Sequence, residues 1–236
     1  MSEQSSLLGQ KNYFQKPLGF YTLFWVFMIG CFLGVILEIA WFYITHHYYE
    51  NRSGLVYGPF NLVYGLGVLG MTACLYWISK KSLILLFAGS CIVGSVFEFL
   101  CSWFQETMFG TVSWDYREIS WNLGGRIHLS LSLIWGLLGI FWMKVLFPLC
   151  HSLLQKLPEI LVRPLTVGMI VFMIINIAVS AAAMSRMSER RHGIAPENTI
   201  EEWVDSHFPD ERMEKIFTNV LFVEGEERIP LQSITK

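Results

Sequence analysis

The sequence predicts an all-α integral membrane protein with five transmembrane helices and a short helical tail in water. Its composition is the first reason, since 53% of the 236 residues are hydrophobic and only 15% are charged, which is too apolar for an ordinary soluble domain. The second reason is a set of apolar segments long enough to cross about 30 Å of hydrocarbon. They run over Leu18–Tyr43, Pro59–Ser79, Ser82–Trp103, Ile127–Pro148 and Pro164–Met184.

These segments divide the chain into three parts. Residues 1–17 are a polar N-terminal segment without a small-residue cleavage site, so we do not expect a removable signal peptide. Residues 18–184 form the transmembrane domain, and residues 185–236 form a charged tail that is too short for an independent domain. In the tail, Thr199-Ile200-Glu201-Glu202 predicts a capping box that opens a short helix, and Asp210 could cap a second one.

One motif occurs twice in the apolar region. The segments 30–38 and 90–98 each place a small residue, a glycine and a glutamate at spacings of four, ending at Glu38 and Glu98. This spacing puts the three residues on one stripe of a helix. The small residues allow another helix to approach closely. We therefore interpret the first four spans as two hairpins in the same orientation, a parallel repeat.

The polar residues at membrane depth gather at one end of the predicted hairpins. An ionisable residue inside a membrane marks a functional site by default, because leaving it unpaired costs about 2.5 kcal/mol or more. We expect one polar cavity that binds a small ligand or ion, and the alternative is a network that only fixes helix packing. The candidate residues are Glu38, Asn61, Glu98, Asp115, Asn122 and Arg126.

Other functional classes have less support in the sequence. A formal net charge of −2 gives no basic field for nucleic acid. No nucleophile motif, glycine-rich phosphate loop or metal-ligand spacing is present, so we expect no metal, no cofactor and no ATPase activity in this chain. The odd number of cysteines argues against a disulfide framework and favours small packing residues. They are Cys31, Cys74, Cys91, Cys101 and Cys150.

The distribution of basic residues predicts the orientation in the bilayer. Five spans place the termini on opposite sides, and one set of loops carries more lysine and arginine than the other. The loops with more basic residues are expected in the cytoplasm, which predicts a cytoplasmic N-terminus and an external tail. Three arginines after the last span, Arg186, Arg190 and Arg191, reduce the difference in basic residues between the two sides. The basic residues of the expected cytoplasmic side are Lys11, Lys16, Lys80, Lys81, Lys156 and Arg163.

Several of these motifs together resemble a known family. The Gly-x-x-x-Glu of the first span, Gly58-Pro59 before the second span, Trp114-Asp115-Tyr116 and Asn122-Leu123-Gly124-Gly125-Arg126 are similar to those of the bacterial CmpB-like family of type IV ABC-transporter permeases. The resemblance covers about residues 20–158. It implies a multi-pass protein of the bacterial inner membrane that works in an export or uptake system with a separate ATPase subunit.

Three functions stay open at this level. The leading hypothesis is a permease-like subunit in the lipid bilayer, which would need at least a homodimer because five spans are few for a transport pathway. A second is an enzyme acting on a lipid-linked substrate, with Glu38 or Glu98 as general base and Arg126 holding an anionic head group. A third is an accessory or sensor protein whose external tail contacts a partner.

Overall fold

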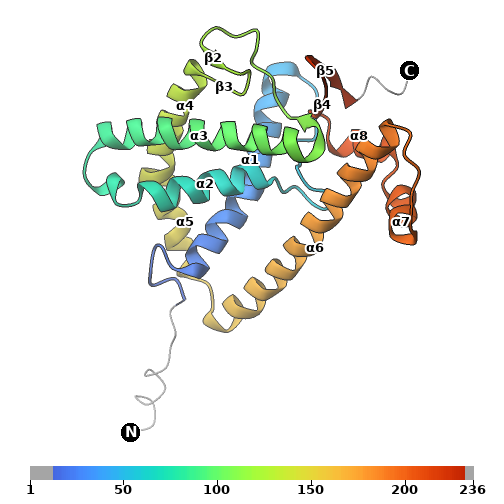
Figure 1. Ribbon diagram of the computed structural model, residues 1–236. Coiled ribbons are helices and arrows are strands. Elements are labelled where there is room, and N and C mark those ends of the chain that lie inside the picture. The colour runs from blue at the N-terminus through green and yellow to red at the C-terminus, as the bar shows by residue number, and fades with distance from the viewer. Residues whose placement is uncertain (1–12, 232–236) are drawn as a thin grey trace.

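The computed structural model describes residues 13–231, which form a mostly helical protein with short strands at one end (Figure 1). Four helices in this part of the chain are long and apolar enough to cross a membrane. They are α1 (Phe20–His46), α3 (Leu83–Phe109), the continuous helix formed by α4 (Leu129–Phe141), η2 (Trp142–Leu146) and α5 (Phe147–Leu154), and α6 (Glu159–Arg191). The protein is therefore a multi-pass membrane protein, as the composition predicts. Most of the predicted N-terminal polar segment lies outside the described residues.

The second predicted span forms a shorter helix than expected. Helix α2 covers Leu62–Leu75, which is 14 residues, and the 3-10 turn η1 (Ile78–Lys80) leads from it to α3. At 1.5 Å per residue α2 is about 21 Å long, which is less than the thickness of the hydrocarbon core. Its start is fixed by Asn61, whose side chain accepts a hydrogen bond from the backbone N–H of Val63 at 3.0 Å. The count of five spans remains a prediction.

The fourth predicted span ends at Pro148, but the helix continues to Leu154. A π-helical stretch, η2, lies just before the proline, and the N–H of Phe147 there donates to the carbonyl of Trp142. Because proline lacks an N–H and its ring clashes with the preceding turn of a regular helix, a widened turn lets the chain continue past it. The helix therefore extends beyond the predicted end of the fourth span, to Leu154.

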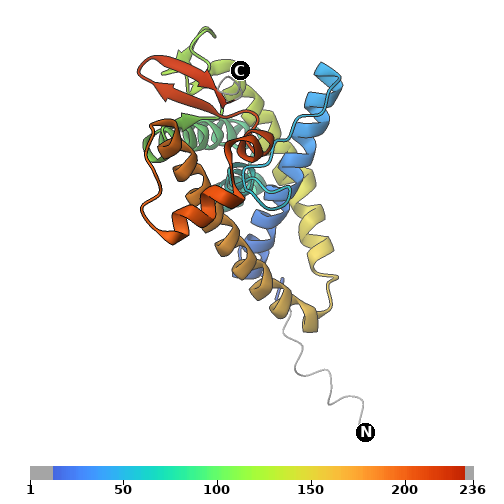
Figure 2. The ribbon, with the colours of Figure 1, turned by 90° about the vertical axis from the view of Figure 1, so that its right-hand side faces the viewer.

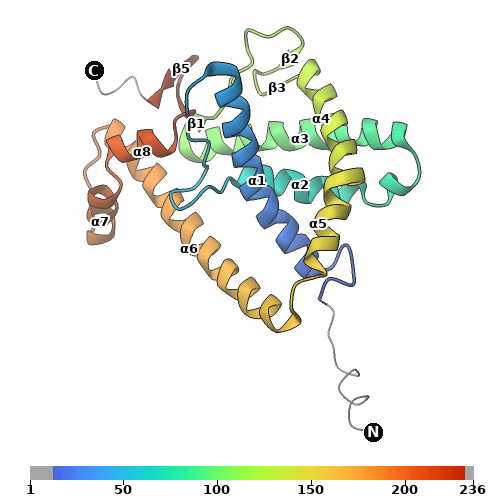
Figure 3. The same cartoon turned by 180° about the vertical axis from the view of Figure 1, so that it is seen from behind.

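The long helices cross one another at steep angles. In Figure 1, α2 and α3 lie side by side and run across α1 and the α4–α5 helix, and Figure 2 shows α3 nearly end-on. Figure 3 shows α6 running obliquely away from the α4–α5 helix. At the end away from the strands, Phe14 is buried against Leu154 and Val162, and its carbonyl contacts Nε2 of His151 at 2.9 Å. This contact ties the N-terminal segment to α5.

The tail contains strands as well as helices, so the prediction of a helical tail was incomplete. Helices α7 (Thr199–His207) and α8 (Asp210–Ile216) are followed by the antiparallel strands β4 (Leu221–Glu224) and β5 (Glu227–Pro230). Strand β4 also pairs with β1 (Thr111–Val112), just after α3. A further small hairpin, β2 (Asn122–Leu123) and β3 (Ile127–His128), precedes α4.

The capping box that opens α7 lies one residue earlier than predicted. The cap is Asn198, which accepts hydrogen bonds from the N–H groups of Ile200 and Glu201, while Glu201 accepts one from the N–H of Glu197. The tail then packs its buried side chains on the end of α6 and on the loop after α1. This cluster includes Val56, Met184, Met187, Val204, Phe208, Met213 and Phe222.

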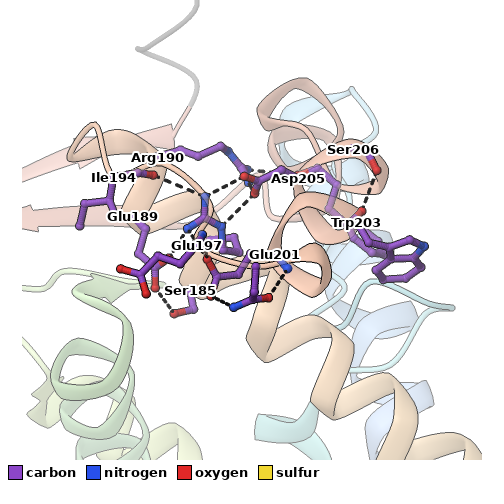
Figure 4. A network of polar contacts seen from close by, with 12 residues as sticks. Ser185, Glu189, Arg190, Ile194, Glu197, Glu201, Trp203, Asp205 and Ser206 are labelled. Carbon is purple, nitrogen blue, oxygen red and sulfur yellow. Dashed lines mark hydrogen bonds and ion pairs between the residues drawn. The ribbon is translucent and has the colours of Figure 1, made fainter.

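An ion-pair network fastens the tail to the last turns of α6 (Figure 4). The Arg186 side chain is only 4% exposed, and its Nε and Nη2 donate to the two carboxylate oxygens of Asp205 at 3.1 and 2.7 Å. Arg190 also pairs with Asp205 and reaches Asp210 at 2.5 Å, and Arg191 pairs with Glu224 at 2.7 Å. The three arginines that complicate the charge count are thus fixed in place by acidic residues of the tail.

We expect the tail to detach from α6 in acid. Hydrogen bonds from Arg186, and then those from Arg190, hold the pKa of Asp205 below its ordinary value, against the opposing effect of burial. Because this pKa is lower in the folded protein, ionised Asp205 stabilises the fold. The stabilisation is fully present above the pKa of about 3.9 that an aspartate has in the unfolded chain, and it is lost as the pH falls through the pKa of the folded protein. Cleavage by pepsin within residues 192–231 should therefore increase below about pH 4. A tail that stays resistant at about pH 2 would contradict this.

Candidate functional site

Glu38 lies on α1 and contacts both α2 and the loop between the two helices. It accepts a hydrogen bond from the hydroxyl group of Tyr64, near the start of α2. Its other oxygen lies 3.7 Å from Nη1 of Arg52, which also pairs with Glu50 at 3.2 Å. The Arg52 side chain is 13% exposed and its guanidinium lies 4.3 Å from the ring centroid of Phe42. Glu38 therefore shares a partly buried arginine with Glu50.

Glu98 lies on α3 and is 6% exposed. One carboxylate oxygen accepts a hydrogen bond from the hydroxyl of Tyr116 at 3.1 Å, and the other accepts one from Nε1 of Trp135, on α4, at 2.8 Å. Both donors are neutral. Within residues 13–231, Glu98 forms no ion pair.

The two helix pairs are held together by the same kinds of contact. A Cβ added at Gly34 would overlap the ring of Tyr64, and one added at Gly94 would lie 2.5 Å from Cγ of Trp135. Each glycine thus leaves room for an aromatic side chain of the next helix, which hydrogen-bonds the glutamate one turn after that glycine. In both pairs, the residue directly after the aromatic one is also a glycine. Gly65 packs on Cys31, and Gly136 packs on Cys91 with a Cβ–Sγ distance that would be 2.7 Å.

Arg126 does not pair with either predicted glutamate. Its Nη2 lies 2.5 Å from the carboxylate of Glu106, two turns beyond Glu98 on α3, and its Nη1 donates to Ser102 at 3.1 Å. Arg228 of β5 lies 3.5 Å from the same carboxylate. Glu106, near the end of α3, therefore joins the loop before α4 to the tail, which no pattern in the sequence predicts.

Tyr116 contacts Glu98 and lies near enough to Glu38 for its charge to affect the phenol. Burial raises the pKa of its phenol, and the nearby Glu98 carboxylate, which it hydrogen-bonds, and the Glu38 carboxylate raise it further. Its ring contacts the imidazole ring of His128 edge-on, with centroids 4.7 Å apart. The Nδ1 atom of His128 is buried and has no hydrogen-bond partner in the described part of the chain. Both carboxylates thus raise the pKa of Tyr116, whose ring packs against a histidine.

Three predicted site residues have structural contacts in the loops. Asn61 caps α2 and donates from Nδ2 to the carbonyl of Arg52 at 3.3 Å, which helps to hold that arginine beside Glu38. Asn122 closes the β2–β3 turn by accepting from the N–H of Gly125 at 2.9 Å. Asp115 pairs with Arg117 at 2.7 Å.

The loop contacts also position Tyr116. Gly125 has a φ of +71° and its carbonyl accepts a hydrogen bond from the N–H of Tyr116 at 2.8 Å. Gly125 can adopt this left-handed conformation because it has no Cβ. The contacts of Asp115 and Asn122 therefore support the loop that presents Tyr116 to Glu98.

An open groove of about 510 Å³ lies apart from these polar residues, between α1, α5 and α6. Its lining is almost wholly apolar, without a charged side chain, which suits contact with lipid tails. The lining residues are Trp25, Met28, Ile29, Phe32, Leu33, Phe60, Cys150, Leu153, Leu154, Leu157 and Met169. The polar site and the groove are thus separate features.

Comparison with known families now adds to this geometry. A sequence model of the family described as "Putative ABC-transporter type IV", ABC_trans_CmpB, matches residues 25–181. The chain belongs to this family. A comparison with curated proteins and one with solved structures each find no match.

The ABC_trans_CmpB region contains both glutamates and their aromatic partners, but it ends before the arginines that hold the tail. Membership of the ABC-transporter type IV family is consistent with the sequence resemblance and with the apolar helices. Sequence reasoning missed Arg52, Tyr64, Glu106 and Trp135 as members of the site. A signal for two of them is present, because an aromatic residue directly precedes a glycine in both Tyr64-Gly65 and Trp135-Gly136.

Proposed function

We propose that this protein is the membrane subunit of an ABC-type transport system and that it binds a cation, or the cationic group of a small ligand, between two repeated hairpins. The site would include Glu38 and Glu98, with Asn61, Asp115, Asn122 and Arg126 holding the surrounding loops. A separate ATPase would supply the energy, since no nucleotide-binding motif occurs in this sequence. The location would be a bacterial inner membrane, with the N-terminus in the cytoplasm and the tail outside.

The observation that supports this best is the buried Glu98 without a positive partner. A carboxylate taken out of water is costly unless it is paired with a positive charge. Tyr116 and Trp135 satisfy its oxygens but leave its negative charge uncompensated. A carboxylate in this state favours the arrival of a positive charge. The alternative of a purely structural network explains Glu38, which has Arg52, better than it explains Glu98.

The proposed repeat rests on the paired contacts of the two hairpins. Gly34, Tyr64 and Glu38 in the first hairpin correspond to Gly94, Trp135 and Glu98 in the second. A parallel repeat places equivalent residues around a common axis. Because the chain has few membrane helices, we further propose that two copies assemble in the working transporter.

The first test is the identity of the partner. We expect that the full-length protein, purified in mild detergent from its native host, carries a P-loop ATPase in a stoichiometric amount, identified by mass spectrometry. Recovery of the chain alone, or only with bound lipid, would refute the assignment to an ATP-driven system.

The second test uses the purified complex in liposomes. Glu98→Gln should lower ATP hydrolysis coupled to transport by about tenfold or more, because glutamine lacks the negative charge that would bind the cation, and a loss of about 1.4 kcal/mol is tenfold. Gly70→Ala is the matched control, since a Cβ there meets no atom within 4 Å. Unchanged coupled hydrolysis in the Glu98→Gln complex would exclude this carboxylate from the cycle.

A further inference from the structure

We propose that the cation bound at Glu98 is a proton, and that Tyr116 and His128 connect this carboxylate to the side of the membrane where the tail lies. The inference rests on the proposed function, because it names the species that the site would bind. It treats the two glutamates of the hairpins as different in role, with Glu98 exchanging a proton and Glu38 keeping a fixed ion pair.

The different partners of the two glutamates carry this distinction. Glu38 lies 3.7 Å from Arg52, so its carboxylate form is stabilised by a positive charge. The arginine before the second helix of the second hairpin, Arg126, is instead paired with Glu106 at 2.5 Å. Glu98 accepts hydrogen bonds only from the neutral groups of Tyr116 and Trp135. Adding a proton therefore neutralises a charge at Glu98 but would break an ion pair at Glu38.

The size and donors of the site favour a proton over a metal ion. Glu98 is 6% exposed, and each of its oxygens already accepts one hydrogen bond. A metal ion would need several further ligands. Residues 13–231 contain no group of three or more histidine, cysteine, aspartate or glutamate side chains placed to hold one. A proton needs no additional space or ligand.

Protonation of Glu98 would reverse one of its hydrogen bonds. The indole N–H of Trp135 can only donate, so the oxygen that it contacts stays an acceptor and the proton is added to the oxygen facing Tyr116. The Tyr116 O–H passes its proton to this carboxylate oxygen while the Tyr116 oxygen takes a replacement proton from the His128 side, so the phenol is neutral before and after the step. The new carboxyl O–H then donates to the Tyr116 oxygen, and the new Tyr116 O–H points to the His128 side. The buried Nδ1 of His128, on the ring that contacts Tyr116, is an atom in need of a partner.

Water on the tail side supplies the proton and receives it again, so no other reactant is required. Two other titratable groups lie around this path. One is Cys101, three residues after Glu98 on α3. The other is Glu38 on α1, whose negative charge raises the pKa of Tyr116. Arg126 and Glu106 compensate each other nearby. These groups set the pH at which Glu98 exchanges its proton.

Infrared difference spectroscopy of the purified full-length protein tests the proposal directly. Between acidic and alkaline buffer, the wild-type protein should show the C=O band of a protonated buried carboxylic acid. This band should be lost in Glu98→Gln and retained in Glu38→Gln. In Tyr116→Phe the band should shift in frequency, because the carboxyl O–H loses its acceptor. His128→Phe should alter the band less but change the pH at which it appears.

A band that persists in Glu98→Gln, or that is lost only in Glu38→Gln, would overturn the proposal. If Glu98→Gln fails to fold, Trp135→Phe tests whether the band belongs to Glu98. That variant removes the indole donor to Glu98 and leaves its carboxyl group in place, so the band should shift in frequency. An unshifted band in both Tyr116→Phe and Trp135→Phe would then overturn it. The result is independent of the partner, so the absence of an ATPase and the absence of a titrating Glu98 are separate outcomes.

Discussion

Arg186→Ala should release the tail from α6 at neutral pH. The variant removes one partner of Asp205 from a largely buried ion pair, in which the arginine side chain is 4% exposed and the aspartate side chain 19% exposed. Breaking one side of a buried ion pair costs about 3–5 kcal/mol, because the remaining charge is left uncompensated. Since Asp205 keeps Arg190 at 2.5 Å, we expect about 3 kcal/mol, the lower end of this range.

Hydrogen–deuterium exchange measures this loss in the folded protein. Amides of α7 and of β4 should lose protection by about 100-fold, which corresponds to about 3 kcal/mol. Arg163→Ala is the control, because Arg163 is exposed near the other end of the same helix. Arg186→Lys should give a smaller loss, since a lysine keeps the charge but not the two parallel hydrogen bonds. Unchanged protection in Arg186→Ala would mean that the apolar cluster alone holds the tail.

Two close helix contacts in the membrane part could be predicted from patterns in the sequence. The stripe of Gly34 and Glu38, repeated as Gly94 and Glu98, predicts close helix contacts with a carboxylate beside them, and both contacts exist. Such patterns are informative because a helix of 3.6 residues per turn converts spacing directly into a shared face. Whether the two stripes line one ligand site stays a prediction, which depends on the tests given above.

The partners of these residues could not be predicted in the same way. Arg126 has Glu38, Glu98 and Glu106 as possible partners, and only the tertiary structure selects Glu106. Asn61 is predicted as a ligand-binding residue, which stays a prediction, and its side chain also caps α2, directly after it. The pairing of β4 with β1 joins residues more than a hundred positions apart, so no local pattern specifies it. These contacts depend on how the helices cross, which spacing alone does not determine.

Gly94→Leu should separate α3 from α4 and disrupt the surroundings of Glu98. A side chain at this position would displace Trp135, whose Cγ lies 2.5 Å from the place of a Cβ, and the 2.8 Å hydrogen bond to Glu98 would be lost. Overpacking costs about 1–3 kcal/mol and a hydrogen bond to a charged group about 1.5–3 kcal/mol, so we expect a total of about 3 kcal/mol or more. The thermal midpoint should fall by about 6–12 °C.

Two comparisons show whether this loss comes from the helix contact and whether the hairpins are equivalent. Gly70→Leu is the control, because a Cβ at Gly70 meets no atom within 4 Å, and its midpoint should stay close to that of the wild type. Gly34→Leu should resemble Gly94→Leu, since it would displace Tyr64 from Glu38 in the same manner. A large loss in one hairpin and none in the other would contradict the proposed repeat, because equivalent copies must depend equally on the glycine that admits the aromatic ring.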